Sequence, residues 1–165
     1  MTDTNAALQA LSQALRLEEE GLAFYTQAAK RVADEAAEKM LLSLADDERR
    51  HREMVQRQIH ALEGEGSYVL LPDASAPVID LERQIFPPQR EAADARLGVD
   101  PGELDILHVA LDNEVRSYDL YRHAAQEEDD LAGQEMYRFL AGAELTHFNL
   151  LMANYESISQ AGGWV

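Results

Sequence analysis

The 165-residue chain contains no cysteine, and this absence excludes several kinds of chemistry at once. Without thiols there is no disulfide, no cysteine nucleophile, no zinc ribbon and no rubredoxin-type iron site. The first residues lack the basic segment and apolar run of a signal peptide. No stretch reaches the ~20 apolar residues that a membrane span needs. We therefore expect a cytoplasmic protein.

Positive charge is also scarce. The chain has 14 Lys and Arg residues against 31 Asp and Glu residues, which gives a formal net charge of −17. Such a surface repels phosphate backbones and anionic lipid headgroups, so we expect neither a nucleic acid nor a membrane as partner. The excess of carboxylates has two interpretations. They solubilise the surface, or some of them lie inside the protein.

Apolar residues recur at helical spacing in four segments, which predicts two helix pairs over residues 5–62 and 101–159. The first pair divides into helices at about 5–32 and 35–62, and the fourth helix begins near residue 130 or 131. Asp3 or Thr4, Asp34 and Asp100 are suited to N-cap positions. The glycines at 64, 66, 162 and 163 are expected to end the second and fourth helices.

The segment between the pairs, residues 63–100, contains four of the five prolines and is not expected to form one long helix. Its "YVLL" is compatible with a short extended piece and its "LERQIF" with one or two helical turns. A connection this long in a compact domain requires an explanation. An all-α, ferritin-like four-helix bundle supplies one, because a long crossover joins its second and third helices. We expect residues 1–165 to form one such domain.

The two halves of the sequence align without a gap at an offset of 96 residues, and the repeat includes polar residues. Glu18 corresponds to Glu114. The "ERRH" that contains Glu48 and His51 corresponds to the "ELTH" that contains Glu144 and His147. One Glu-x-x-His motif arises easily by chance, but two copies at one offset, each preceded by a matching Glu, do not. All six residues fall on the apolar stripes of their helices, which predicts that they face the bundle interior.

Four unpaired buried carboxylates would cost several kcal/mol each, more in total than a domain's net stability of about 5–15 kcal/mol. Two divalent cations would neutralise them. One Glu from each of two helices and a Glu-x-x-His from each of the other two is the ligand pattern of di-iron carboxylate bundles. Oxygen and imidazole donors without thiolate suit iron or manganese, and zinc would also bind. We expect Glu48 and Glu144 to bridge, whereas the pairing of Glu18 and Glu114 with the two histidines stays open.

Tyrosines accompany the single-glutamate ligands. Tyr25 and Tyr121 follow Glu18 and Glu114 by seven residues, which is two helical turns. They are either hydrogen-bond donors to the ligands or ordinary core residues, and Tyr118 is a similar candidate. His60, His108 and His123 have no counterpart at the repeat offset and are expected to lie outside the cluster. Trp164 is expected to anchor the C-terminal tail.

Four stretches, "RLEEEGLAFYTQAA", "DDERRH", "LDNEVRSYDLYRHAA" and "GAELTH", resemble the helices of the rubrerythrin di-iron domain in the ferritin-like superfamily. The similarity extends over essentially the whole chain and includes "ERQIFP" and the tail "YESISQAGGWV". Two departures matter. The chain has no cysteine for the rubredoxin domain that delivers electrons in rubrerythrin. It also has Ser117 where that family has an extra carboxylate that assists peroxide reduction, which weighs against a peroxidase.

The resemblance implies a non-haem di-iron oxidoreductase that reduces hydrogen peroxide or reacts with dioxygen, using electrons from a separate donor protein. Two iron ions are the expected cofactors, with manganese or mixed metals as alternatives. A ferritin-like iron-handling protein and a dimanganese catalase are the competing functions. A helical interaction protein without metals is the non-enzymatic alternative. The family also implies a homodimer, in which helix pairs could be exchanged through the long connection.

Overall fold

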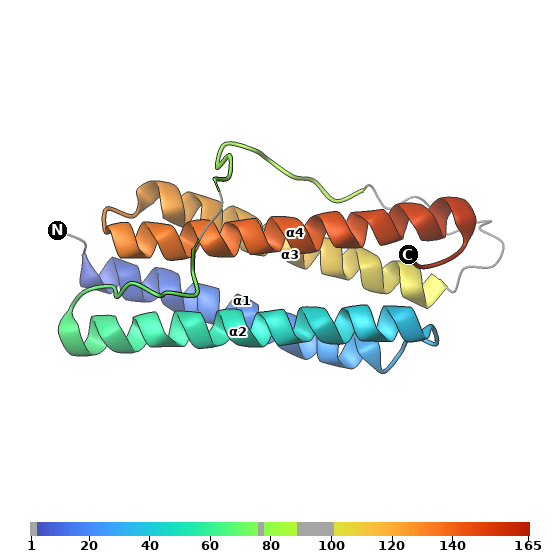
Figure 1. The fold of residues 1–165 in the computed structure, drawn as a ribbon, viewed down its shortest axis with the longest axis horizontal. Coiled ribbons are helices and arrows are strands. Elements are labelled where there is room, and N and C mark those ends of the chain that lie inside the picture. Colours follow the sequence, from blue (N-terminus) through green and yellow to red (C-terminus); the bar gives the residue numbers. More distant parts are fainter. Residues whose placement is uncertain (1–2, 76–77, 89–100) are drawn as a thin grey trace.

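The computed structural model describes residues 3–75, 78–88 and 101–165, and its regular structure is entirely helical. The four helices are α1 (Thr4–Ala29), α2 (Glu35–Glu65), α3 (Pro101–Glu127) and α4 (Leu131–Ala161). All four lie along the long axis of the molecule (Figure 1). This arrangement confirms the predicted all-α, ferritin-like four-helix bundle.

The helix ends repeat with the same offset as the rest of the sequence. Asp34 caps α2 by accepting a hydrogen bond from the Ala37 amide at 2.9 Å, and Asp130 caps α4 in the same way. Gly66 and Gly162 end these helices in the left-handed conformation, with φ of 73° and 77°. The expected cap at Asp100 lies outside the described residues.

Helix α1 ends at Ala29, before the predicted end near Val32. The amides of Lys30 and Arg31 bond to carbonyls three residues back instead of four, which tightens the chain into a turn. The turn leads directly to the Asp34 cap. Helix α2 extends to Glu65 rather than Leu62, because Gly64 continues the helix and only Gly66 breaks it.

The helices form two antiparallel hairpins, α1 with α2 and α3 with α4, and α1 packs against α3 between them. In Figure 1 the α3–α4 hairpin lies above the α1–α2 hairpin, and α2 and α4 face the viewer. The described part of the crossover, in green, leaves the end of α2 and passes over this face of the bundle. The two repeated halves of the sequence are therefore the two hairpins.

The crossover is held by helix side chains. Gln58 on α2 both donates to the Val69 carbonyl at 2.7 Å and accepts from its amide at 2.9 Å. Tyr118 donates to the Arg83 carbonyl at 2.6 Å. Among the described residues "YVLL" pairs with no strand, and "LERQIF" contains only a turn at 81–82. The one or two helical turns with which "LERQIF" is compatible do not form.

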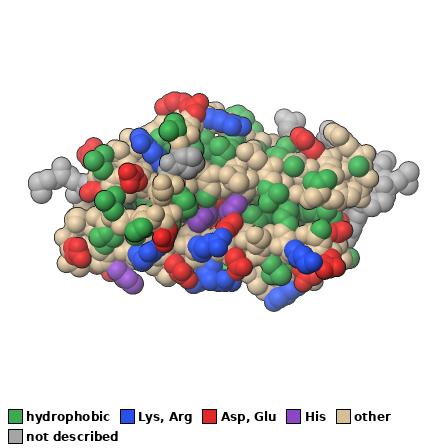
Figure 2. Space-filling model, viewed as in Figure 1, with side chains coloured by type: hydrophobic (Ala, Val, Ile, Leu, Met, Phe, Trp, Pro, Cys, Tyr) green, Lys and Arg blue, Asp and Glu red, His purple; other side chains and the backbone are tan. Residues whose placement is uncertain are grey.

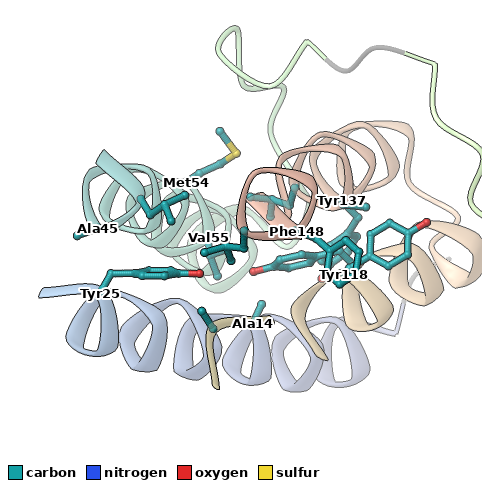
Figure 3. Close-up of a cluster of buried hydrophobic side chains, with 14 of the residues drawn as sticks. Ala14, Tyr25, Ala45, Met54, Val55, Tyr118, Tyr137 and Phe148 are labelled. Carbon is teal, nitrogen blue, oxygen red and sulfur yellow. The ribbon is translucent and has the colours of Figure 1, made fainter. Parts of the chain in front are cut away.

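The core continues on both sides of the polar cluster. Leu11, Leu107 and Leu140 are fully buried on the predicted stripes. Figure 3 shows part of this core, including Tyr25, whose ring extends from α1 with its hydroxyl toward the bundle centre. At the C-terminus, the Trp164 indole donates to Glu103 at 3.1 Å, as expected for a tail anchor.

Candidate metal centre

The six polar residues predicted to face inward are brought together at the middle of the bundle. Each has an exposed fraction of 5% or less. They come from all four helices: Glu18 on α1, Glu48 and His51 on α2, Glu114 on α3, and Glu144 and His147 on α4. The burial follows from helical spacing, because each residue occupies a core position among Leu, Ala and Tyr neighbours.

The cluster divides into two overlapping groups of four ligands. One contains Glu18, Glu48, His51 and Glu144, and the other contains Glu48, Glu114, Glu144 and His147. Within each group, one donor atom per residue lies within 4.8 Å of the others. Glu48 and Glu144 belong to both groups. The geometry therefore fits two metal ions bridged by these two carboxylates, and it pairs Glu18 with His51 and Glu114 with His147.

Both imidazoles present Nδ1 to the carboxylates. His51 Nδ1 lies 3.4 Å from Glu18 and 3.3 Å from Glu144. His147 Nδ1 lies 3.3 Å from Glu144, and the two rings stack with centroids 5.7 Å apart. Since a neutral imidazole binds a metal through the nitrogen that carries no proton, Nδ1 is the donor atom in both residues.

The cluster leaves hydrogen-bonding capacity unused. Five buried donor or acceptor atoms in it have no hydrogen-bond partner among the described residues: Glu18 Oε2, His51 Nδ1, Glu114 Oε2, Glu144 Oε1 and His147 Nδ1. Unpaired polar atoms in a protein core are costly unless a ligand satisfies them. Oxygen and imidazole donors suit divalent transition metals. The cluster therefore fits a di-metal site.

Burial and mutual repulsion shift the ionisation of the carboxylates. Burial raises the pKa of Glu114 to about 8, and the neighbouring charge of Glu144 adds to this rise. The same two causes raise the pKa of Glu48 well above its usual range. Burial would also raise the pKa of Glu144, but the two histidine rings beside it, His147 first, outweigh burial and lower this pKa. The carboxylates thus need either protons or cations to coexist.

The histidines respond to the same surroundings in the opposite sense. Burial by itself would lower the pKa of His51, but Glu144 and Glu18 raise it well above its usual value. Burial is likewise outweighed at His147, where Asp47 and the cluster carboxylates raise the pKa. Both rings are therefore surrounded by negative charge. This charge favours a metal cation bound at Nδ1 as much as it favours a proton there.

Tyr25 and Tyr121 connect the two hairpins. The hydroxyl of Tyr25 on α1 donates to Glu114 on α3, and that of Tyr121 on α3 donates to Glu18 on α1. Burial, followed by the charge of the nearby glutamates, raises the pKa of both hydroxyls well above the ordinary value. Both tyrosines therefore remain neutral donors that orient a carboxylate. Each serves the glutamate of the opposite hairpin, not the one on its own helix.

The other candidate residues have different roles. Tyr118 bonds to the crossover and not to a ligand. His60 and His123 are exposed, as expected. His108 is buried against the Tyr155 ring, with centroids 5.2 Å apart, and so belongs to the core away from the cluster.

Sequence reasoning missed Asp47 and Gly21. Asp47 lies 3.1 Å from the outer nitrogen, Nε2, of His147. Its position directly before Glu48 in "DDERRH" was the available signal. Gly21 lies one turn after Glu18 and faces Glu48, where a Cβ atom would come within 2.9 Å of Oε2. Its signal was a glycine on an otherwise occupied core stripe.

The cluster is approached from opposite sides by two cavities. A cavity of about 500 Å³ between α2 and α4 is lined by His51, His147 and Asp47. Figure 2 shows histidine near the middle of this face, beside Lys or Arg and Asp or Glu side chains. On the other side, a cavity of about 10 Å³, the size of one water molecule, touches Glu48, Glu114 and Ser117.

No helix in the described part of the chain is long and apolar enough to cross a membrane.

Three comparisons with known proteins agree with this geometry or are neutral. A solved structure of a hypothetical protein from Pyrococcus furiosus has a similar fold, with a TM-score of 0.67 and 20% sequence identity. The match covers 92% of this chain and 89% of that one. A search of curated proteins gave no significant match. The family model described as Rubrerythrin matches residues 9–155. The chain therefore belongs to the rubrerythrin family, within the ferritin-like superfamily.

Proposed function

We propose that the protein is a non-haem di-iron oxidoreductase that reduces hydrogen peroxide or reacts with dioxygen, with electrons from a separate donor protein. The observation that carries the proposal is the pair of four-ligand groups sharing Glu48 and Glu144, which fits one binuclear site better than two separate ones. Two iron ions bound there would supply the electron pair that reduces an O–O bond.

The protein's own contribution is to hold the ligands in a dry, shaped site. The neutral hydroxyls of Tyr25 and Tyr121 orient Glu114 and Glu18 across the two hairpins. Leu11, Leu107 and the other fully buried apolar side chains keep bulk water away from the carboxylates. The small cavity beside Glu48 and Glu114 has room for about one water molecule and excludes an organic substrate from that side of the cluster.

The donor set, which contains carboxylates and imidazoles and no sulfur, suits iron or manganese, and the family resemblance favours iron. These 165 residues contain no cysteine for a rubredoxin-type iron site, and we propose that the electrons come from a separate protein. We further propose that the protein acts as a homodimer, which is the arrangement expected from the family resemblance. Light scattering on the purified full chain tests this assembly.

The reaction is tested by loading the metal-free chain anaerobically with two Fe(II) per chain and adding hydrogen peroxide in steps. We expect one peroxide to be consumed for each pair of irons oxidised, with a rise in near-ultraviolet absorption. A parallel titration with dioxygen distinguishes the two oxidants, since Ser117 replaces the carboxylate that assists peroxide reduction in the family. Loaded protein that consumes neither oxidant would contradict the proposal.

Two variants show whether the reaction belongs to this site. Glu144→Gln removes one bridging carboxylate and should abolish both iron binding and oxidant consumption. Glu19→Gln, an exposed glutamate on α1, is the matched control and should change neither. Continued Fe(II) oxidation with iron retained beyond two ions per chain would favour iron handling. Oxygen release by the manganese-loaded chain would favour a catalase.

A further inference from the structure

The internal repeat that produces the metal ligands is broken beside the histidines. On the His147 side, Nε2 lies 3.1 Å from the Asp47 carboxylate, while Nδ1 faces the cluster. Asp47 is in turn paired with Arg50 one turn further along α2. These side chains form a series of contacts that begins at the surface with Arg50, continues through Asp47 to His147, and ends at the candidate metal position.

The corresponding position in the other hairpin cannot make this contact. At the offset of 96 residues, Asp47 corresponds to Ala143, which has no polar side chain. Ala143 and His51 both line the cavity between α2 and α4. The described residues offer Nε2 of His51 no hydrogen-bond acceptor, and the His51 ring makes an edge contact with the Phe139 ring, with centroids 6.3 Å apart. The two imidazoles are thus supported differently.

The two histidines also differ in the number of carboxylates that lie near Nδ1, on the inner side of the cluster. Nδ1 of His147 lies within 3.5 Å of three carboxylates, those of Glu48, Glu114 and Glu144. Nδ1 of His51 has two at comparable distance, those of Glu18 and Glu144. A metal ion in the His147 half would find its donor atoms more nearly gathered around one point.

We propose that the two metal positions are inequivalent, and that Asp47 is the positioning residue that makes the Glu114–His147 half bind metal more tightly than the Glu18–His51 half. The inference rests on the proposed di-metal function and adds an order of filling to it. The physical reason is that a carboxylate accepting the Nε2 proton fixes the ring orientation, leaves Nδ1 free for metal, and increases its basicity.

The test is a titration of the metal-free full chain with Co(II). Binding is monitored by calorimetry and by visible absorption. We expect two binding steps of different affinity in the unmodified chain. Asp47→Ala should weaken the tighter step by roughly 10- to 100-fold, the usual effect of removing such a hydrogen bond, and leave the weaker step unchanged. Asp47→Asn should lose less, because its amide oxygen still accepts from Nε2 but carries no charge.

The matched control is Asp46→Ala. Asp46 pairs with Arg49 as Asp47 pairs with Arg50, on the same turn of α2, but it contacts none of the six ligands. It should leave both binding steps unchanged. A change in overall charge or in helix stability would alter the Co(II) affinity of both variants. A difference in affinity between the two variants therefore reports the specific contact of Asp47 with His147.

A spectroscopic measurement reports on the hydrogen bond itself. In the Co(II)-loaded chain, the Nε2 protons of the two ligating histidines give hyperfine-shifted NMR signals. We expect one of these protons to exchange slowly with solvent and the other rapidly. Asp47→Ala should make the slow proton exchange rapidly, whereas Asp46→Ala should not.

Two Co(II) ions bound with equal affinity, or an Asp47→Ala variant that weakens both steps alike or neither, would overturn the inference and leave the di-metal site intact. A chain that binds fewer than two Co(II) ions would instead contradict the proposed function. The two failures are therefore distinguishable in one experiment.

Discussion

At the scale of single residues, the candidate metal site depends on the absence of a side chain at Gly21 as well as on the ligands. Gly21 follows Glu18 by one turn of α1 and leaves the space that the Glu48 carboxylate fills. Its counterpart at the repeat offset is Ser117, which is also small and buried. Both hairpins therefore use a small residue beside the ligands.

Replacing Gly21 by alanine should lower metal affinity. The added Cβ would lie 2.9 Å from Glu48 Oε2, so the Glu48 carboxylate must move. Overpacking of this kind costs about 1–3 kcal/mol, and a cost of that size in the metal-bound state lowers affinity by roughly 5- to 150-fold. Equilibrium titration with Co(II) measures the effect.

Gly64→Ala is the control, because nothing lies within 4 Å of the position that its Cβ would occupy. Gly64 lies within α2, so alanine there should stabilise the fold by about 0.5–1 kcal/mol and leave metal binding unchanged. A Gly21→Ala chain that binds Co(II) as tightly as the unmodified chain would show that Glu48 does not need this space.

At the scale of helices, two similar hairpins are joined by contacts of different kinds. Helices α1 and α3 pack against each other on one side of the boundary between the hairpins. Tyr25 and Tyr121 cross this boundary to reach a glutamate on the other hairpin. On the α2–α4 side, the stacked imidazoles of His51 and His147 and the shared carboxylates meet. Bound metals would therefore also fasten one hairpin to the other.

The crossover is attached at Gln58, and we expect Gln58→Ala to release it. The substitution removes both hydrogen bonds to Val69, each with a net contribution of about 0.5–1.5 kcal/mol. The segment after α2 should then be cleaved faster by chymotrypsin at Tyr68, Leu70 or Leu71, while Co(II) binding is retained. Mass spectrometry of the fragments identifies the site.

Gln56→Ala provides the comparison for this variant, since Gln56 lies on the same helix and makes no hydrogen bond to the described part of the crossover. Its cleavage rate should equal that of the unmodified chain. Equal rates for Gln58→Ala as well would mean that other contacts, such as that of Tyr118 with Arg83, hold the crossover by themselves.

At the scale of the whole molecule, the dry cluster makes stability depend on what neutralises it. Burial raises the pKa of Glu114 from 4.5 to about 8. The pKa values of His51 and His147 also lie well above 6.5, because of the surrounding carboxylates. Between about pH 5 and pH 8 the folded metal-free chain therefore binds more protons than the unfolded chain. Its free energy of unfolding must then fall as pH rises.

We accordingly expect the urea midpoint of the chelator-treated chain to be lower at pH 8 than at pH 5.5. The lowered pKa of Glu144 does not oppose this trend, because its contribution is already complete above the unfolded value of 4.5. The metal-loaded chain should show the opposite trend, since metals compete with protons for the same atoms. Glu114→Gln should flatten the slope of the metal-free chain. A midpoint that rises with pH without metal would contradict this account.

The sequence alone determined the fold class and the composition of the cluster. Helical spacing decides which face of a helix a residue occupies. Glu18, Glu48 and Glu144 could therefore be assigned to the interior from the neighbouring apolar residues, and the repeat offset showed that the two hairpins contribute equivalent groups. Gly66 and Gly162 likewise marked helix ends, because a residue without a Cβ atom adopts the left-handed conformation of a helix end most readily.

Only the tertiary structure decided which residues meet across the helices. The axial register and rotation of neighbouring helices place Tyr25 on Glu114 instead of Glu18, and bring Asp47 to His147 while Ala143 leaves His51 without such a partner. They also pair Glu18 with His51, a choice that the spacing left open. The physical reason is that a repeat along the chain fixes positions within a helix, whereas contacts between helices depend on how their side chains interlock.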